Sequence, residues 1–156
     1  MADIVSKAKR SQMMSGIRGK DTKPEMIVRQ GLHARGYRFR LHRKDLPGKP
    51  DIVLPKYHAA IFVNGCFWHG HDCHLFKWPK TRESFWREKI GLNRERDVAT
   101  VSNLLSQNWR VLVIWECAIK GRLKQEPDTF WGLTTQWLDS WTPFSEIRSA
   151  KHNDDG

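Results

Sequence analysis

Residues 65–74 read GCFWHGHDCH and place two cysteines and three histidines within ten positions. A third cysteine, Cys117, follows a separate apolar run. Thiolate sulfur and imidazole nitrogen suit tetrahedral zinc, and four protein ligands close its coordination shell, as in structural sites. If neighbouring strands bring Cys117 beside the loop, the pattern predicts a structural zinc bound by Cys66, His71, Cys73 and Cys117. The alternative is that the cysteines are free and buried beside an unrelated histidine cluster.

An aspartate at the start of an apolar run is a candidate ligand for Mg²⁺. Asp51 opens the run DIVL (51–54), and a second run, AAIFVN (59–64), follows. Hard oxygen ligands suit Mg²⁺, which can hold and polarise a scissile phosphate. The second acid and the lysine that often accompany such an aspartate are missing from the second run, so we expect the backbone carbonyl of Val63 to assist Asp51. The alternative is that Asp51 caps a turn.

Two further residues could take part in this chemistry. The predicted zinc does not need His69, and an imidazole near a metal-activated phosphate can act as a general base toward water. Glu25 would share a helix face with Val28 and Leu32. Its carboxylate could complete a capping box with Thr22, support the active site, or do both.

Large apolar side chains lie next to these candidates. Phe67 and Trp68 adjoin a predicted zinc ligand, and a loop held by zinc would present them rigidly. Rigid aromatic side chains can wedge between base pairs, and ordinary core packing is the alternative. Trp86 is a third candidate wedge. Met14 and Ile17 could enter a minor groove, or could form a short apolar pair that packs internally.

Charge and composition indicate the class of partner. The formal net charge is +10, and residues 1–49 contain 13 Lys/Arg against 4 Asp/Glu. A basic segment in a chain with 8 Trp favours nucleic acid over membrane as the partner. No apolar stretch is long enough to span a membrane, and the first residues lack the apolar core of a secretory signal, so we expect neither a transmembrane helix nor a signal peptide. Three cysteines are an odd number and cannot all pair in disulfides, which favours a reducing, cytoplasmic location.

The elements that must position these residues follow from the apolar pattern. A length of 156 residues is typical of one domain. Thr22 and Pro24 predict a helix start, and Gly36 predicts its end. Strands are expected at 37–42, 51–54, 59–64 and 110–115. Further helices are expected at 82–107, interrupted near Gly91, with Val98, Val101 and Leu105 in one stripe, and at 128–139, with Phe130, Leu133 and Trp137 on one side. The order predicts a mixed sheet covered by helices.

Five stretches of the sequence resemble one known family. They are MMSGIRGKDTKPE (13–25), LPGKPDIV (46–53), IFVNGCFWHGHDC (61–73), FWREKIGLNRERD (85–97) and VLVIWEC (111–117). In this order they are similar to the very short patch repair endonucleases, nearly as far as residue 140. The resemblance implies an α/β, restriction-endonuclease-like fold, with a mixed central sheet flanked by helices and a structural zinc.

The resemblance also implies an activity. Family members make a Mg²⁺-dependent nick on the 5′ side of the thymine in a T·G mismatch, which arises when 5-methylcytosine deaminates. Double-stranded DNA is then the partner, a MutL-like repair protein is a candidate partner, and the enzyme is expected to be a monomer that associates with the nucleoid. Residues 1–20 would form a basic DNA-contacting arm, 21–142 the endonuclease domain, and 143–156 a mobile polar tail.

The family's site residues can be carried over by position. Its metal-binding aspartate falls on Asp51, its essential histidine on His69 and its assisting glutamate on Glu25. The resemblance assigns zinc to Cys66, His71, Cys73 and Cys117, wedging to Phe67, Trp68 and Trp86, minor-groove contacts to Met14 and Ile17, and base or backbone contacts to Lys89 and Asn93.

Asn64 departs from the family, because some members carry a second active-site histidine there. An amide can donate a hydrogen bond but cannot take a proton at neutral pH, which favours His69 as the group that exchanges protons, whether as base or as acid, with a phosphate contact as the alternative. Two rival interpretations remain. One is a nuclease of the same fold with another specificity, such as site-specific double-strand cleavage, and the other is a non-catalytic, zinc-stabilised DNA-binding protein.

Overall fold

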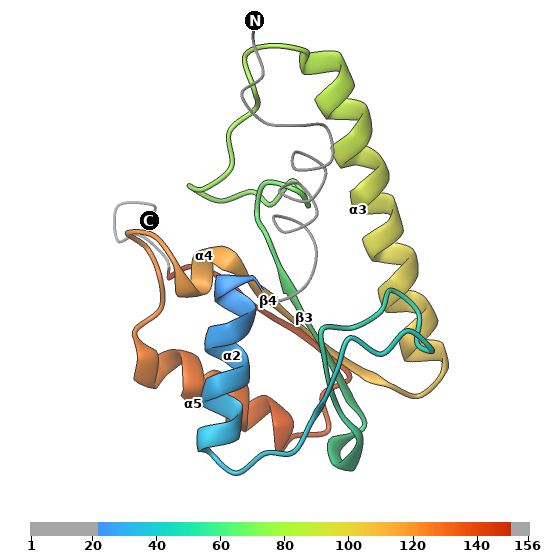
Figure 1. The fold of residues 1–156 in the computed structure, drawn as a ribbon, viewed down its shortest axis with the longest axis vertical. Helices are drawn as coiled ribbons and strands as arrows, with labels where there is room; N and C mark the ends of the chain where they lie inside the picture. The colour runs from blue at the N-terminus through green and yellow to red at the C-terminus, as the bar shows by residue number, and fades with distance from the viewer. Residues whose placement is uncertain (1–21, 151–156) are drawn as a thin grey trace, which may run out of the picture.

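The computed structural model describes residues 22–150, which form a five-stranded mixed sheet with helices on both faces (Figure 1). The strands, in spatial order, are β1 (Arg40–Leu41), β2 (Ile52–Leu54), β3 (Ala59–Asn64), β4 (Arg110–Trp115) and β5 (Phe144–Ile147). The first three strands pair antiparallel, and the last three run parallel. The predicted mixed α/β architecture is confirmed.

Helices of very different length cover the sheet. They are α2 (Lys23–Ala34), α3 (Glu83–Ser106), α4 (Glu116–Ile119) and α5 (Pro127–Leu138), with a short 3-10 helix, η1 (Pro55–Tyr57), between β2 and β3. In Figure 1, α2 and α5 lie together beside the sheet, and α3 runs along the opposite side. The helix α3 connects the parallel strands β3 and β4, since such a pair needs a long crossover.

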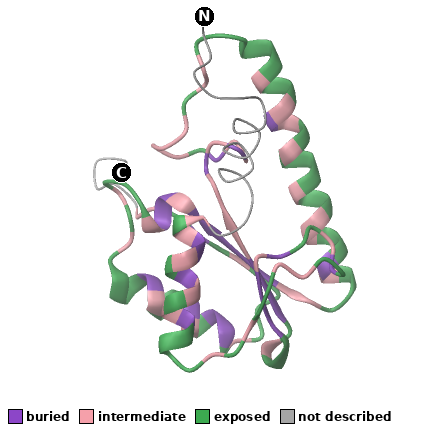
Figure 2. Ribbon diagram, viewed as in Figure 1, coloured by how far each residue is buried: buried purple, intermediate pink, exposed green. Residues whose placement is uncertain are grey.

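The central strands β2, β3 and β4 bury residues on both faces, which is why their sequences read as continuous apolar runs. In β4, Leu112 and Ile114 pack on the side of α2 and α5, and Val111 and Val113 pack on the side of α3. Figure 2 shows the same distribution, with buried residues concentrated in the strands, α2 and α5, whereas most of α3 is exposed or half-buried. The predicted strands at 59–64 and 110–115 are confirmed.

The first described helix has the predicted start and end. The Thr22 hydroxyl accepts a hydrogen bond from the Glu25 N–H at 3.4 Å, and Pro24 lies in the first turn. Gly36 follows the helix with a φ of +87°, a conformation that glycine adopts without strain. Val28 and Leu32 are fully buried in the core. The helix therefore fixes the direction of Glu25, which shares their face.

Three details of the predicted elements are wrong. In the segment 37–42, only Arg40 and Leu41 pair in the sheet, because His42 has a φ of +47° and turns the chain out of the strand. The long helix continues through Gly91, since a single glycine weakens a helix without breaking it. In its expected stripe, Val98 is exposed and Leu104 is buried instead.

The last helix and the tail also differ from expectation. In α5, Leu133 is exposed and Thr134 is buried between Phe130 and Trp137, since Thr134 lies on their helix face. The prediction of a mobile tail from residue 143 is wrong for residues 144–147, which form β5 against β4. The expected arm, 1–20, lies outside the described residues. Among residues 22–150, no helix is both long and apolar enough to cross a membrane.

Candidate active site and metal centre

The ends of two parallel strands bring the predicted zinc ligands together. Asn64 at the end of β3 pairs with Trp115 at the end of β4, so the segments that follow start side by side. Cys66 and Cys117 each lie two residues beyond these positions. The loop then returns His71 and Cys73, and one ligand atom from each of the four residues lies within 4.8 Å of all the others.

The distances within this cluster suit a tetrahedral metal ion. The Nδ1 atom of His71 lies 3.6 Å from Cys66 Sγ and 3.5 Å from Cys117 Sγ. Around zinc, with Zn–S near 2.3 Å and Zn–N near 2.0 Å, sulfur and nitrogen ligands are separated by about 3.5 Å. Cys66, Cys117 and His71 are buried, and Cys73 is half-buried. The donor types, their spacing and their burial all fit zinc.

The thiols are already polarised by their mutual contacts. The Cys66 thiol donates to Cys117, and this contact, with additional hydrogen bonds from His71 and Ser149, lowers the pKa of Cys117 to about 3. The same contact and burial raise the pKa of Cys66. Burial raises the pKa of Cys73. These contacts favour the thiolate form at Cys117, and the thiolate is the form of cysteine that binds a metal cation.

Side chains from β4 and α4 orient the ligands. The indole of Trp115 stacks on the His71 ring, with centroids 3.9 Å apart and planes at 4°. The Glu116 carboxylate accepts a hydrogen bond from the Cys66 N–H at 3.1 Å. Neither role was predicted, although both residues directly precede the ligand Cys117 in sequence. Such supporting contacts set ligand orientation in metal sites.

The segment after β5 is tied to the same centre. Ser149 donates its N–H to Cys117 Sγ at 3.3 Å. Arg148 forms two 2.9 Å hydrogen bonds with Asp72, one to its carboxylate and one to its carbonyl oxygen. Arg148 and Ser149 lie in the segment that was predicted to be a mobile tail, and they instead contact Asp72 and Cys117 in and beside the cysteine and histidine cluster.

A second group of candidate metal ligands lies at the start of β2. Glu25, His42 and Asp51 come from α2, the residue after β1 and the residue before β2, and their ligand atoms lie within 4.8 Å of one another. The Glu25 side chain is 1% exposed, and its Oε2 lies 2.7 Å from His42 Nε2 and 3.5 Å from Arg29 Nη1. His42 was not predicted, because no local motif links it to residues 9 and 17 positions away.

The carboxyl group and the main-chain carbonyl of Asp51 each accept a hydrogen bond from a backbone N–H. Its Oδ2 accepts a hydrogen bond from the Val63 N–H at 2.8 Å, and the His42 N–H donates to the Asp51 carbonyl at 3.0 Å. Burial raises the pKa of Asp51 to about 7. The Val63 N–H opposes this shift, and the negative charge of Glu25 adds to it. The contact with Val63 is thus made by its N–H group.

His69 is separated from the cysteine cluster and faces α3. Its Nδ1 lies 2.5 Å from the Asp97 carboxylate, and its ring meets the edge of Trp115 at a centroid distance of 6.0 Å. Asp97 was not predicted, because it is 28 residues from His69 and looks like an ordinary charged residue of an exposed helix. An imidazole held at Nδ1 by a carboxylate leaves Nε2 for proton transfer.

One groove of about 1840 Å³ brings these groups together. Its lining includes the candidate chemical groups His42, Asp51, Asn64, His69 and Asp97. It also includes the cationic side chains Lys44, Lys49, Arg94, Arg96 and Arg148. A groove lined by titratable groups and by cationic side chains suits a phosphodiester polymer.

The candidate wedge residues form an aromatic cluster beside this groove. The rings of Phe67, Trp68 and Trp86 lie in mutual contact, with centroids between 5.2 and 5.7 Å apart. Trp68 is 8% exposed, and its carbonyl oxygen accepts a 2.9 Å hydrogen bond from Asn93.

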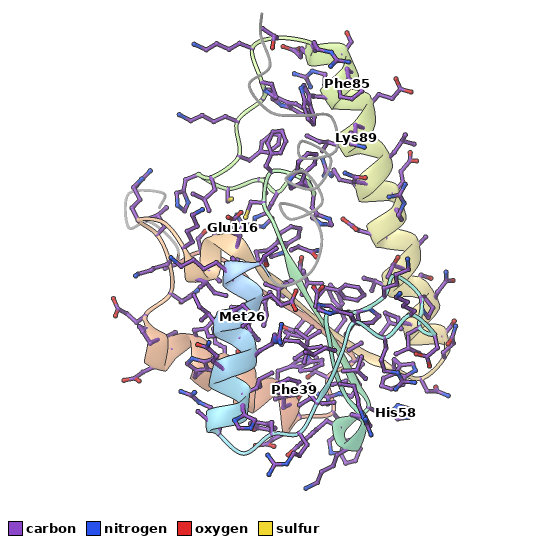
Figure 3. The ribbon with its side chains drawn as sticks, in the orientation of Figure 1. Met26, Phe39, His58, Phe85, Lys89 and Glu116 are labelled. Atoms are coloured by element: carbon purple, nitrogen blue, oxygen red, sulfur yellow. The ribbon has the colours of Figure 1, made fainter. Side chains whose placement is uncertain are left out.

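The remaining DNA-contact candidates are spread more widely. Asn93 lines the groove, whereas Lys89 lies toward the far end of α3, distant from α2 (Figure 3). The structure therefore brings Asn93, but not Lys89, to the catalytic candidates. Met14 and Ile17 lie outside the described residues.

Comparison with known proteins identifies close relatives. Residues 2–75 match the family described as DNA mismatch endonuclease Vsr. The chain is 45% identical over 141 residues to DNA mismatch endonuclease Vsr of Escherichia coli K12, covering 90% of this chain and 88% of that protein. It is 50% identical over 119 residues to the type II nicking enzyme V.XorIIP of Xanthomonas oryzae, covering 76% of this chain and 88% of that protein.

Proposed function

Because the chain belongs to the Vsr family of DNA mismatch endonucleases, we propose that it nicks one strand on the 5′ side of the thymine in a T·G mismatch. Such a mismatch is the product of 5-methylcytosine deamination. The observation that carries the proposal is the shared groove, which Asp51 and His69 line together with five Lys and Arg residues. The proposed fold is that of restriction endonucleases, in agreement with the mixed sheet.

Two cations complete the proposed enzyme. Cys66, His71, Cys73 and Cys117 would hold zinc, which would keep the loop 65–74 in one shape. Asp51 would hold Mg²⁺ in the groove, and Glu25, which belongs to the same group of candidate ligands, would support it. In a strand the N–H and C=O of one residue point to the same side, so the Val63 N–H bond to Asp51 supports the Val63 carbonyl as a further ligand. Bound Mg²⁺ would polarise the scissile phosphate.

His69 would transfer the proton, and Asp97 would hold the His69 ring. Asp97 accepts a hydrogen bond from Nδ1 of the imidazole, which fixes the tautomer whose Nε2 can take a proton from water. Asn64 lines the same groove and can donate a hydrogen bond to water or phosphate, but its amide cannot serve as a base. Glu25 would assist by orienting groups at the cation.

The aromatic cluster would open the duplex beside the mismatch. Phe67, Trp68 and Trp86 lie on the zinc-held loop and on α3. Insertion of aromatic side chains unstacks base pairs at a cost of a few kcal/mol, and this cost is lowest at a pair that is already weakened. Because Trp68 is buried in the absence of DNA, we expect its side chain to move on binding. Met14 and Ile17 would contact the minor groove, and Lys89 and Asn93 the bases or backbone.

The proposed enzyme acts as a monomer on double-stranded DNA. A MutL-like repair protein is a proposed further partner. The three free cysteines suit a cytoplasmic location, where thiols stay reduced.

A strand-resolved cleavage assay tests the proposal. Duplexes that differ only in carrying T·G, C·G or T·A at one position are incubated with the zinc-loaded protein and Mg²⁺. We expect one nick, 5′ of the thymine, in the T·G duplex alone. Equal cutting of all three duplexes, or cutting of both strands, would refute mismatch specificity and favour a nuclease of other specificity.

A substitution connects the assay to the groove. Asp51→Ala should abolish nicking while binding to the T·G duplex persists, since the cationic side chains that line the groove and the aromatic cluster remain. Nicking retained by this variant would refute the assignment of the cation site. Binding without nicking by the wild-type protein would favour the non-catalytic alternative.

A further inference from the structure

We propose that His42 is a direct ligand of the catalytic cation, so that a mixed nitrogen and oxygen site favours Mn²⁺ over Mg²⁺. The inference rests on the proposed function for Asp51 and Glu25 and extends it to a residue that has no local motif. His42 lines the groove and contributes an imidazole to the same group of ligand atoms as the two carboxylates.

The spacing of the three side chains suits one octahedral ion. Their ligand atoms lie within 4.8 Å of one another. An ion with bonds of about 2.1 Å separates adjacent ligands by about 3 Å and opposite ligands by about 4.2 Å. The 2.7 Å distance between His42 Nε2 and Glu25 Oε2 would need to open by only a few tenths of an ångström. No rearrangement of the strands is required.

The backbone holds His42 in place at a conformational cost. Its φ of +47° lies in the left-handed region, which non-glycine residues seldom adopt and which occurs with functional sites. Its N–H donates to the Asp51 carbonyl at 3.0 Å. The Asp51 carboxylate is in turn fixed by the Val63 N–H. Two of the three ligands are therefore positioned relative to each other by main-chain hydrogen bonds.

The charges around the cluster favour a divalent cation. Two carboxylates, from Glu25 and Asp51, face one small volume, and Glu25 is 1% exposed. Arg29, 3.5 Å from Glu25, supplies one positive charge on the side of α2. Carboxylates that share a site repel each other, and a dication between them would remove this repulsion. A neutral His42 can then bind the ion through Nε2.

The chemistry of the third ligand decides which cation is preferred. Mg²⁺ strongly prefers oxygen ligands and keeps much of its water. Imidazole nitrogen is a better ligand for first-row transition ions, among which Mn²⁺ tolerates mixed nitrogen and oxygen sites. A site with His42 should therefore bind Mn²⁺ more tightly than Mg²⁺.

The test measures cation binding on the full-length, zinc-loaded protein. Mn²⁺ is titrated by electron paramagnetic resonance, Mg²⁺ by competition, and pulsed measurements detect a nitrogen nucleus bonded to Mn²⁺. His42→Asn is the informative variant, because asparagine also adopts left-handed backbone. His58→Asn is the matched control, since His58 also has a left-handed φ, +52°, but lies against Trp109 outside the groove lining.

We expect the wild type and His58→Asn to show nitrogen coupling to Mn²⁺ and His42→Asn to lack it. Loss of a ligand should weaken Mn²⁺ binding by about 10-fold to 100-fold, the loss of affinity that is typical when residues supporting metal ligands are replaced. The effect on Mg²⁺ binding should be smaller. Thermal unfolding of each variant verifies that it is folded.

Three results would overturn the proposal. These are no nitrogen coupling in the wild type, coupling that persists in His42→Asn, or equal weakening of Mn²⁺ and Mg²⁺ binding. The last result would mean that His42 only orients Glu25 through their hydrogen bond. Failure of the proposed function is distinguishable, because the wild type would then not nick the T·G duplex with either cation.

Discussion

At the scale of single residues, the carboxyl group of Asp51 is subject to opposing influences. Burial and the charge of Glu25 raise its pKa, to about 7, and the Val63 N–H lowers it. Without a cation, the folded state therefore favours the protonated acid below about pH 7, whereas the same side chain in the unfolded chain ionises near pH 4. Because the folded state then binds more protons, the contribution of Asp51 to stability falls as the pH rises from about 4 to 7.

The first prediction follows from this direction of the dependence of stability on pH. Without added Mg²⁺, Asp51→Asn should raise the free energy of unfolding of the zinc-loaded protein at pH 8 by a few kcal/mol. The gain should vanish below about pH 4, where the acid is protonated in both states. Urea unfolding across this pH range measures the effect. Glu95→Gln, at an exposed position on α3, is the control, and an equal, pH-independent change in both variants would contradict the argument.

His69 depends on Asp97 in a different way, because the carboxylate holds its ring rather than binding a cation. The second prediction is that Asp97→Ala lowers kcat for T·G nicking by about 100-fold, the lower end for a misplaced general base, with little change in KM. Nitrogen NMR of the His69 ring should show a mixture of tautomers in place of one. If kcat falls no more than in the control Glu95→Ala, Asp97 has no positioning role.

At the scale of elements, the strands that could be predicted are those buried on both faces. Runs 59–64 and 110–115 are continuous apolar sequences, and their side chains divide between the two core clusters, one on each face of the sheet. The sequence FSEI (144–147) has no such signal, since it is short and partly exposed. It becomes β5 because the free edge of β4 offers hydrogen-bonding groups that a nearby segment can satisfy.

The third prediction tests whether β5 belongs to the core. Ile147 is 4% exposed and Phe144, in the same strand, is 36% exposed. Ile147→Ala should lower the free energy of unfolding by about 2–4 kcal/mol, as for buried aliphatic truncations, and Phe144→Ala should cost less although it removes more atoms. Chemical denaturation measures both. The reverse order would show that residues 144–147 are not packed as described.

The candidate site shows a similar difference between residues that local sequence identifies and residues that only packing brings together. The four candidate zinc ligands could be found from the sequence, because thiols are few and three of the ligands share one loop. His42 and Asp97 could not, since their contacts with Glu25 and His69 span 17 and 28 residues. Such pairs are set by how β1 and α3 pack, which local spacing does not encode.

The fourth prediction concerns the loop that the cysteine and histidine cluster closes. The wild type should contain one zinc per chain, and Cys117→Ser should lose it and several kcal/mol of stability, because metal binding is coupled to folding. Metal analysis and thermal unfolding measure the two effects. Ser149→Ala, which keeps the N–H that contacts Cys117, should retain zinc. A wild-type protein without zinc, or an unaltered Cys117→Ser, would refute the assignment.

At the scale of the whole molecule, positive charge is distributed unevenly. The first 49 residues carry 13 of the 27 Lys and Arg residues, and two of them, Lys44 and Lys49, line the groove. Arg94 and Arg96 on α3 line the same groove. The candidate reacting groups share this lining with the cationic side chains, so electrostatic attraction of the DNA backbone and positioning of the phosphate are functions of the same surface.

The final prediction distinguishes the effect on DNA binding of charge in the groove from the effect of net charge. Each phosphate contact adds about one to the slope of log K against log salt concentration, through release of bound counterions. Lys44→Gln should therefore reduce this slope by about one and weaken binding equally for T·G and matched duplexes, since a backbone contact carries no sequence information. Lys56→Gln changes the net charge identically at an exposed position outside the groove lining and should leave the slope unchanged. Fluorescence anisotropy across a salt series measures both variants, and equal slopes for the two would mean that DNA responds to total charge and not to this groove.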